Sequence, residues 1–128
     1  MKFLSIYTPD EKSAGVPPSK EQIEEIGKSI EEGVKAGVLL ATGALLKGGG
    51  ARVRRSGGQT TVVDGPFTEA KELVAGFSLL EAKSREEAIE LAKSFLEIAG
   101  DGETELRQIM DGSLDVYLQA TPGQSQEA

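Results

Sequence analysis

Two helix-start signals restrict the fold of this chain more than any other feature. Ser19-Lys20-Glu21-Gln22 and Ser84-Arg85-Glu86-Glu87 have the capping-box pattern, in which a serine accepts from the third helical N–H and the third side chain reaches back. Apolar residues at helical spacing follow each box. The pattern predicts helices over residues 20–36 and 85–99, and each segment is followed by a glycine, a common residue where helices end.

The segments around these helices have the aromatic and β-branched composition of strands. We predict strands over residues 2–7, 38–46, 73–82 and 104–110, with the second interrupted at Thr42-Gly43. The apolar residues of the first strand fall on both of its faces, which is typical of a central strand that is covered on both sides.

A β-hairpin is predicted between the second and third of these strands. Ala51 to Ser56 and Gln59 to Asp64 flank Gly57-Gly58, and two glycines in a two-residue loop suit the positive φ angles of a primed turn.

The order of these elements predicts an α+β fold of the ferredoxin-like type, a split β-α-β arrangement with an inserted β-hairpin. Both helices would cover one face of a single sheet and leave the other face open. Two chains packed sheet against sheet would bury that face, which predicts a homodimer in the form of a dimeric α/β barrel. We expect one domain over residues 1–112, an extra strand over 113–120 that is a candidate for crossing to a partner chain, and a flexible tail over 121–128.

The chain has no cysteine and no histidine, and this composition excludes several kinds of site. Disulfides, thiolate metal sites and Ser-His-Asp or Cys-His catalysis are not available within one chain. A catalyst would have to use carboxylates, Lys, Arg, Tyr or backbone groups. We therefore predict no metal and no cofactor.

The formal net charge is −7, from 21 acidic and 14 basic residues. An acidic surface repels nucleic acid phosphates and anionic lipids, so we expect neither as a partner. The apolar run at Phe3 to Tyr7 is too short for a signal peptide, and the longest apolar stretch, residues 37–46, is shorter than the ~20 residues that a membrane span needs. These features predict a cytoplasmic protein.

The highest density of turn-forming and ionisable residues lies in residues 63–72. Asp64 is a candidate general base or ligand anchor there, and the alternative is an Asx turn in which it accepts backbone N–H groups. Phe67 either packs in the core or stacks its ring against a ligand. Glu69 and Lys71 either line a pocket with Asp64 or belong to a solvated turn, and Asp64 with Glu69 is a candidate acid/base pair.

Three further residues are candidates for contacting a ligand. Arg54, on the same side of the hairpin as Arg52, is suited to clamping a carboxylate or phosphate, although a charged edge strand that blocks aggregation is the alternative we favour. Arg107 is placed to neutralise a buried acid, and Tyr7 to donate a hydrogen bond.

The segment Asp64 to Glu72 closely resembles the DGPFAETKE signature of the YCII-related (YciI-like) family, in its DGPF branch. The FLSIY, KAGVLL, RVR, GFSLLE and ELRQIM segments of this chain also correspond in kind and order to that family. The resemblance covers residues 2 to 111. The chain departs from the signature at Thr68 and Ala70, where Ala and Thr are exchanged.

The resemblance implies a dimeric α+β barrel in a bacterial, cytoplasmic protein. Most family members have no assigned reaction, and some of the DGPF branch are linked to extracytoplasmic-function sigma factors. A His-Asp pair is considered catalytic in the better-known branch. Since this chain has no histidine, only Asp64 carries over as the first residue of the motif.

The leading functional hypothesis is the binding of a small polar metabolite in a cleft beside Asp64, without established catalysis. One alternative is a lyase, isomerase or hydrolase that uses Asp64 and Glu69 as acid and base. A further alternative is an interaction module in sigma-factor signalling.

Overall fold

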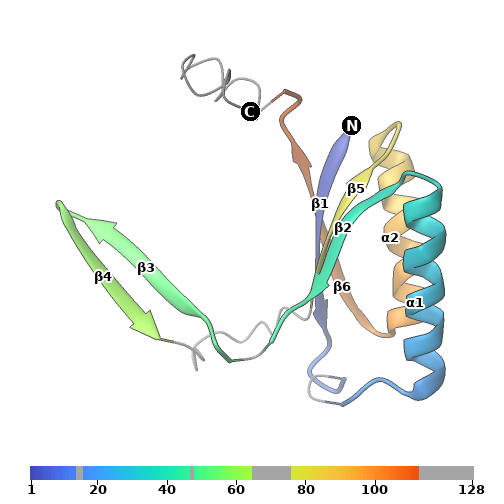
Figure 1. The fold of residues 1–128 in the computed structure, drawn as a ribbon, viewed down its shortest axis with the longest axis horizontal. Coiled ribbons are helices and arrows are strands. Elements are labelled where there is room, and N and C mark those ends of the chain that lie inside the picture. Colours follow the sequence, from blue (N-terminus) through green and yellow to red (C-terminus); the bar gives the residue numbers. More distant parts are fainter. Residues whose placement is uncertain (14–15, 47, 65–75, 113–128) are drawn as a thin grey trace.

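The structure of the chain is a computed structural model that describes residues 1–13, 16–46, 48–64 and 76–112 (Figure 1). The chain forms, in order, β1 (Lys2–Pro9), α1 (Lys20–Lys35), β2 (Leu39–Ala44), β3 (Ala51–Ser56), β4 (Gln59–Asp64), β5 (Gly76–Glu81), α2 (Arg85–Ala99) and β6 (Gly102–Ile109). Both predicted helices and both hairpin strands are therefore confirmed.

Four strands form an antiparallel sheet in the order β2-β5-β1-β6, so β1 is a central strand as predicted. Figure 1 shows α1 and α2 side by side on one face of this sheet. The strand order and the position of the helices are those of the predicted ferredoxin-like α+β fold. Within the described residues, neither helix is long and apolar enough to cross a membrane.

The predicted interruption of the second strand at Thr42-Gly43 is wrong. β2 continues through both residues, which pair with Ser78 and Phe77 of β5, and the register shifts earlier, between Leu39 and Ala41. A Cβ on Gly43 would lie 2.8 Å from Cε1 of Phe77, so glycine makes room for that ring rather than ending the strand.

The start of β6 differs from the predicted one. β6 starts at Gly102 rather than at Thr104, because Gly102 and Glu103 continue the pairing with Pro9 and Thr8 of β1. β5 is described from Gly76 onward. The first residues of its predicted strand, residues 73–75, and the predicted extra strand and tail at 113–120 and 121–128 lie outside the described residues.

Local hydrogen bonds explain why α1 begins and ends where it does. Ser19 Oγ accepts from the Gln22 N–H at 3.1 Å, and Gln22 Oε1 accepts from the Ser19 N–H at 3.0 Å, which confirms the capping box. At the other end the Gly37 N–H donates to Val34 O and the Val38 N–H donates to Gly33 O. With φ at 75° for Gly37, this is a Schellman motif, so the predicted glycine stop is confirmed.

The core lies between α2 and one end of the sheet. Its buried members are Phe3, Leu80, Ala82 and Ala88, and Leu39, Leu91 and Leu106 pack against them. Alternation along β1 directs Phe3 toward the helices and Leu4 toward the opposite face. The core therefore occupies the helix side of the sheet.

The β3–β4 hairpin projects away from the body of the molecule (Figure 1). Gly57 and Gly58 have φ angles of 57° and 79°, which confirms the predicted primed turn. All residues of the two strands are exposed, and Arg55 Nη1 donates across the hairpin to Thr60 Oγ1 at 3.1 Å.

Gly102 is required by a close approach of two strands, and this generates a stability prediction. A Cβ at Gly102 would lie 2.6 Å from the Thr8 carbonyl oxygen and 2.9 Å from Cε1 of Tyr7. We expect Gly102→Ala to destabilise the protein by about 1–3 kcal/mol, measured by urea unfolding, because the β1–β6 pair must move apart.

Gly27→Ala is the matched control. Gly27 lies inside α1, and a Cβ there would meet no atom within 4 Å. Removing an interior helical glycine should stabilise the protein by up to about 1 kcal/mol. If both substitutions changed the free energy of unfolding equally, the close approach of β1 and β6 at Gly102 would not be the cause of the destabilisation.

Candidate functional site

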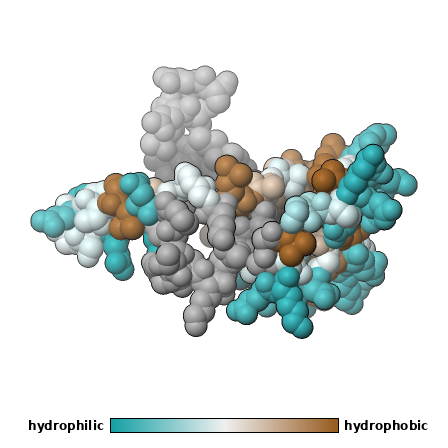
Figure 2. All heavy atoms as spheres, turned by 90° about the horizontal axis from the view of Figure 1, so that it is seen from below, coloured by the Kyte–Doolittle hydropathy of each residue, from teal (hydrophilic) through white to brown (hydrophobic). Residues whose placement is uncertain are grey.

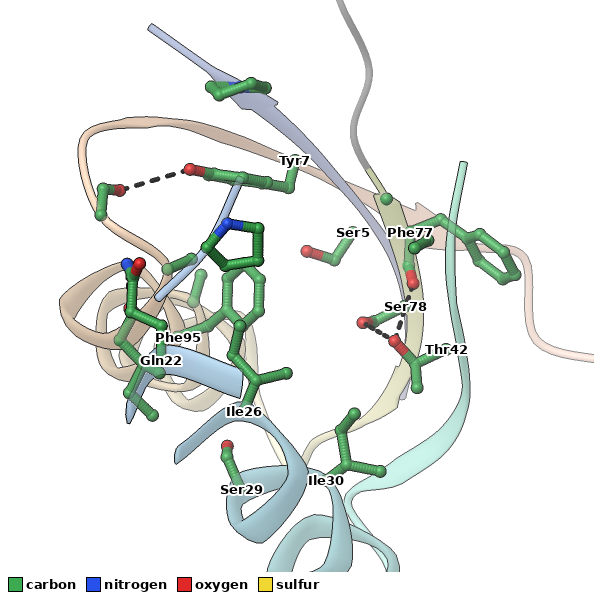
Figure 3. A pocket seen from close by; sticks show the side chains of 18 of the residues that line it. Ser5, Tyr7, Gln22, Ile26, Ser29, Ile30, Thr42, Phe77, Ser78 and Phe95 are labelled. Carbon is green, nitrogen blue, oxygen red and sulfur yellow. Dashed lines mark hydrogen bonds between the residues drawn. The ribbon is translucent and has the colours of Figure 1, made fainter. Parts of the chain in front are cut away.

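A cavity of about 830 Å³ lies between α1, α2 and the helix side of the sheet, and we call it the α1–sheet pocket (Figure 3). Its volume lies within the range usual for small-molecule sites. Apolar side chains from both helices and hydroxyl groups from the sheet line it. The labelled residues that line it are Ser5, Tyr7, Gln22, Ile26, Ser29, Ile30, Thr42, Phe77, Ser78 and Phe95.

The pocket exists because small side chains replace large ones in the middle of the sheet. On the helix side of β1, Phe3 belongs to the core, and the next inward residue is Ser5. On β5, Leu80 fills the core, but the inward positions that precede it are Ser78 and Gly76. None of the residues of α1 is buried, so this helix covers the hollow without filling it.

Three hydroxyl groups form a row across the floor of this pocket. Thr42, Ser78 and Ser5 are register partners on the neighbouring strands β2, β5 and β1. Thr42 Oγ1 lies 3.0 Å from Ser78 Oγ and donates to the Phe77 carbonyl oxygen at 3.0 Å. Ser5 is only 8% exposed, and its hydroxyl has no hydrogen-bond partner among the described residues.

Tyr7 forms one end of the pocket together with Phe95. Their rings meet edge to face, with centroids 5.3 Å apart. The Tyr7 hydroxyl donates at 3.5 Å toward the carbonyl oxygens of Gly100 and Asp101. Burial raises the pKa of Tyr7 above its usual 10.0, and the negative charges of Asp10 and Asp101 raise it further. Tyr7 is therefore a neutral phenol at physiological pH.

Gln22 joins the two helices at the same end of the pocket. Its Oε1 atom closes the capping box of α1, and its Nε2 atom donates to the Ile98 carbonyl oxygen of α2 at 3.4 Å. One side chain thus starts α1 and holds it against the last turn of α2. The helix cap predicted from the sequence has a second role that the local pattern does not reveal.

Comparison with known proteins identifies the family. The YCII-related domain matches residues 1–112. The chain belongs to the YCII-related family.

One curated protein and one solved structure are similar to this YCII-related protein. Uncharacterized protein R00369 of Rhizobium meliloti (strain 1021) is 36% identical over 80 residues, which span 59% of this chain and 64% of that protein. The match thus covers less than two thirds of that relative. The solved structure of 5-chloro-2-hydroxyhydroquinone dehydrochlorinase (TftG) from Burkholderia phenoliruptrix AC1100, in complex with 2,5-dihydroxybenzoquinone, has 19% sequence identity and a TM-score of 0.48. That alignment covers 86% of this chain and 94% of the other. The DGPF branch stays a prediction.

The candidate site residues of this YCII-related protein are distributed over three places. Tyr7 lines the α1–sheet pocket. Asp64 and Arg54 lie on the exposed hairpin and are not among the residues that line the pocket. Arg107, on β6, is exposed and its Nε donates to Glu105 Oε1, so its recorded partner is a surface carboxylate.

The remaining candidates, Phe67, Glu69 and Lys71, lie outside the described residues. Their grouping with Asp64, and the acid/base pair of Asp64 with Glu69, stay predictions. Across the described ranges, no group of three or more His, Cys, Asp or Glu side chains is arranged to hold a metal ion.

Ser5, Thr42 and Ser78 line the pocket but are not among the site residues predicted from the sequence. A signal was present, since Ser5 stands between Phe3 and Tyr7 in the alternation of β1, where a large apolar residue is expected. Its meaning depends on which residues of β5 and β2 lie beside it, and that register is not visible in one strand.

The raised pKa of Tyr7 predicts a pH dependence of stability. A raised pKa in the folded state means that its stabilising contribution is fully present below the usual value of 10.0 and is lost as pH rises through the folded pKa. Chemical unfolding at neutral and strongly alkaline pH should therefore show an extra loss of stability in the wild type relative to Tyr7→Phe, which retains the ring but cannot ionise. If the difference in unfolding free energy between the wild type and Tyr7→Phe is the same at both pH values, the prediction is contradicted.

Proposed function

We propose that this YCII-related protein binds a small, largely apolar, uncharged molecule in the α1–sheet pocket. The observation that carries the proposal is a cavity of about 830 Å³ with apolar walls and a floor of hydroxyl groups. Such a combination suits a ligand whose apolar body is buried and whose orientation is fixed by a few hydrogen bonds.

The charges around the pocket support an uncharged ligand. Among the described residues that line the pocket, Lys12 is the one with a charged side chain, and it is exposed. An ionised ligand group at the floor would lose its hydration without gaining an opposing charge. A neutral group can instead replace water with hydrogen bonds to the hydroxyls.

Binding is better supported than catalysis by the described part of this pocket. No carboxylate is among its described lining residues, and Asp64 lies on the projecting hairpin. We therefore propose the α1–sheet pocket, rather than a cleft beside Asp64, as the ligand site. The acid/base enzyme and the sigma-factor module stay predictions.

Filling the pocket should weaken ligand binding. We expect the uncharged fluorophore N-phenyl-1-naphthylamine to bind the wild type with a saturable rise in fluorescence. Ile26→Trp places a larger side chain at a half-buried position of α1 that lines the pocket, so we expect binding to weaken about tenfold or more.

Ile23→Trp is the matched control on the same helix. Ile23 is 58% exposed and is not among the lining residues. This substitution should leave binding unchanged, and thermal melts of both variants should match the wild type. The absence of saturable binding to the wild type, or equal binding by both folded variants, would contradict the proposal.

We also propose that the protein is a homodimer in which the open sheet faces pack together. Leu4 and Ile6 of β1 pair with Leu79 and Phe77 of β5 on the face opposite the helices, and this forms an apolar surface. In Figure 3 the Phe77 ring turns away from the pocket. Burying this surface against a second copy would remove apolar area from water.

The projecting hairpin supports the same proposal. Val53, Val62 and Val63 are 70%, 63% and 56% exposed, and Figure 2 shows hydrophobic surface on the hairpin at the left of the view. An isolated hairpin is marginally stable in water, so contact with a second copy would stabilise it.

Light scattering should report a mass of two chains for the wild type. Ile6→Glu introduces a charge into the apolar face, and we expect it to shift the protein to a mass of one chain. Thr8→Glu, at the polar end of the same face of β1, should weaken the dimer less. A wild-type mass of one chain at micromolar concentration would contradict the dimer.

A further inference from the structure

The hydroxyl row of the α1–sheet pocket has one arrangement of its hydrogens that makes both contacts of Thr42 hydrogen bonds. A carbonyl oxygen can only accept, so the 3.0 Å contact between Thr42 Oγ1 and the Phe77 oxygen uses the one hydroxyl hydrogen of Thr42. Both contacts are hydrogen bonds at once in the arrangement in which Ser78 Oγ donates across the 3.0 Å that separates it from Thr42 Oγ1. In this arrangement Ser78 presents only lone pairs to the pocket.

Ser5 has the opposite character. Its hydroxyl points into the pocket beside Ser78 (Figure 3), is part of a residue that is only 8% exposed, and makes no hydrogen bond to a described residue. Its hydrogen is free to be donated. The hydroxyl opens into the pocket, so a ligand that accepts from Ser5 would replace water there with a direct hydrogen bond.

The two serines form a donor–acceptor pair on adjacent strands. Ser5 and Ser78 are direct register partners in the antiparallel β1–β5 pair, where side chains on one face lie close together. A group that accepts from Ser5 and donates to Ser78 would satisfy both. A carboxylate or phosphate only accepts, and would meet the lone pairs of Ser78.

We infer that the ligand of the α1–sheet pocket carries a neutral group that both accepts and donates a hydrogen bond, of the alcohol or primary amide class, held by Ser5 and Ser78. Thr42 is a positioning residue, because it keeps Ser78 in the accepting state. The inference rests on the proposed function, since it concerns the ligand of the same pocket. Beyond the proposed function, it names the polar group of the ligand that the pocket selects.

Three probes with one apolar body test this selection. 2-Naphthalenemethanol donates and accepts, its methyl ether only accepts, and 2-naphthoate is an anion that only accepts. Calorimetric titration of the wild type at neutral pH should rank the alcohol about two- to tenfold above the ether, the difference expected for one hydrogen bond. The anion should bind more weakly than either.

Variants separate the roles of the three residues. Ser5→Ala should weaken the alcohol and the ether alike, because both accept from Ser5. Ser78→Ala should weaken the alcohol alone and remove its advantage over the ether. Thr42→Val keeps the shape of the side chain but removes the acceptor of the Ser78 hydrogen. The preference for the alcohol over the ether should therefore become smaller. Ser94→Ala, at an exposed position of α2 outside the pocket lining, is the matched control and should change nothing.

The possible results distinguish this inference from the proposed function. If all three probes bind equally and Ile26→Trp blocks them, the pocket binds ligands but the donor–acceptor selection is wrong. Tighter binding of the anion, or an alcohol preference that survives Ser78→Ala, would also overturn the inference. If no probe binds the folded wild type, both the inference and the proposed function fail.

Discussion

The pairing of β1 with β5 on one side and β6 on the other is the interaction on which the rest of the structure depends. This central strand pairs antiparallel with both neighbours from Lys2 to Tyr7. Because side chains alternate along a strand, the pairing assigns Phe3, Ser5 and Tyr7 to the helix side and Leu4 and Ile6 to the other. The core, the pocket and the open apolar face are all set by this one alternation.

The difference between the two helices decides where the core ends and the pocket begins. α2 packs closely because it presents alanine to the sheet, and Ala88 and Ala92 are buried. α1 has no buried residue, and the sheet beneath it presents Ser5 and Ser78 instead of large apolar side chains. Close packing at one end and small polar residues at the other leave a hollow whose polar groups are concentrated on its floor.

The fold was predictable because its signals are local. The capping box at Ser19, the stop at Gly37 and the Gly57-Gly58 turn each depend on hydrogen bonds or φ angles within a few residues. The wrongly predicted strand break at Thr42-Gly43 arises instead from a contact between residues that are distant along the chain. Glycine usually weakens a strand, but here it accommodates the ring of Phe77, a residue far away in the sequence.

The candidate site was much less predictable than the fold. The density of charged residues along the sequence predicted a site at Asp64. Asp64 and Arg54 lie on an exposed hairpin. Of the predicted site residues that the structure describes, Tyr7 is the one that lines the pocket. Density of ionisable groups along the chain does not measure burial. Burial and neighbouring groups, rather than charge alone, determine the chemistry of a site.

By itself, the sequence of this YCII-related protein determined the helices, the hairpin, the order of the strands and the absence of histidine and cysteine chemistry. Only the tertiary structure decided that Ser5, Ser78 and Thr42 form one row, in which Thr42 contacts both Ser78 Oγ and the Phe77 carbonyl oxygen. The physical reason is that helix caps and turns are satisfied by nearby residues. A hydroxyl row requires the register between three strands that are distant along the chain.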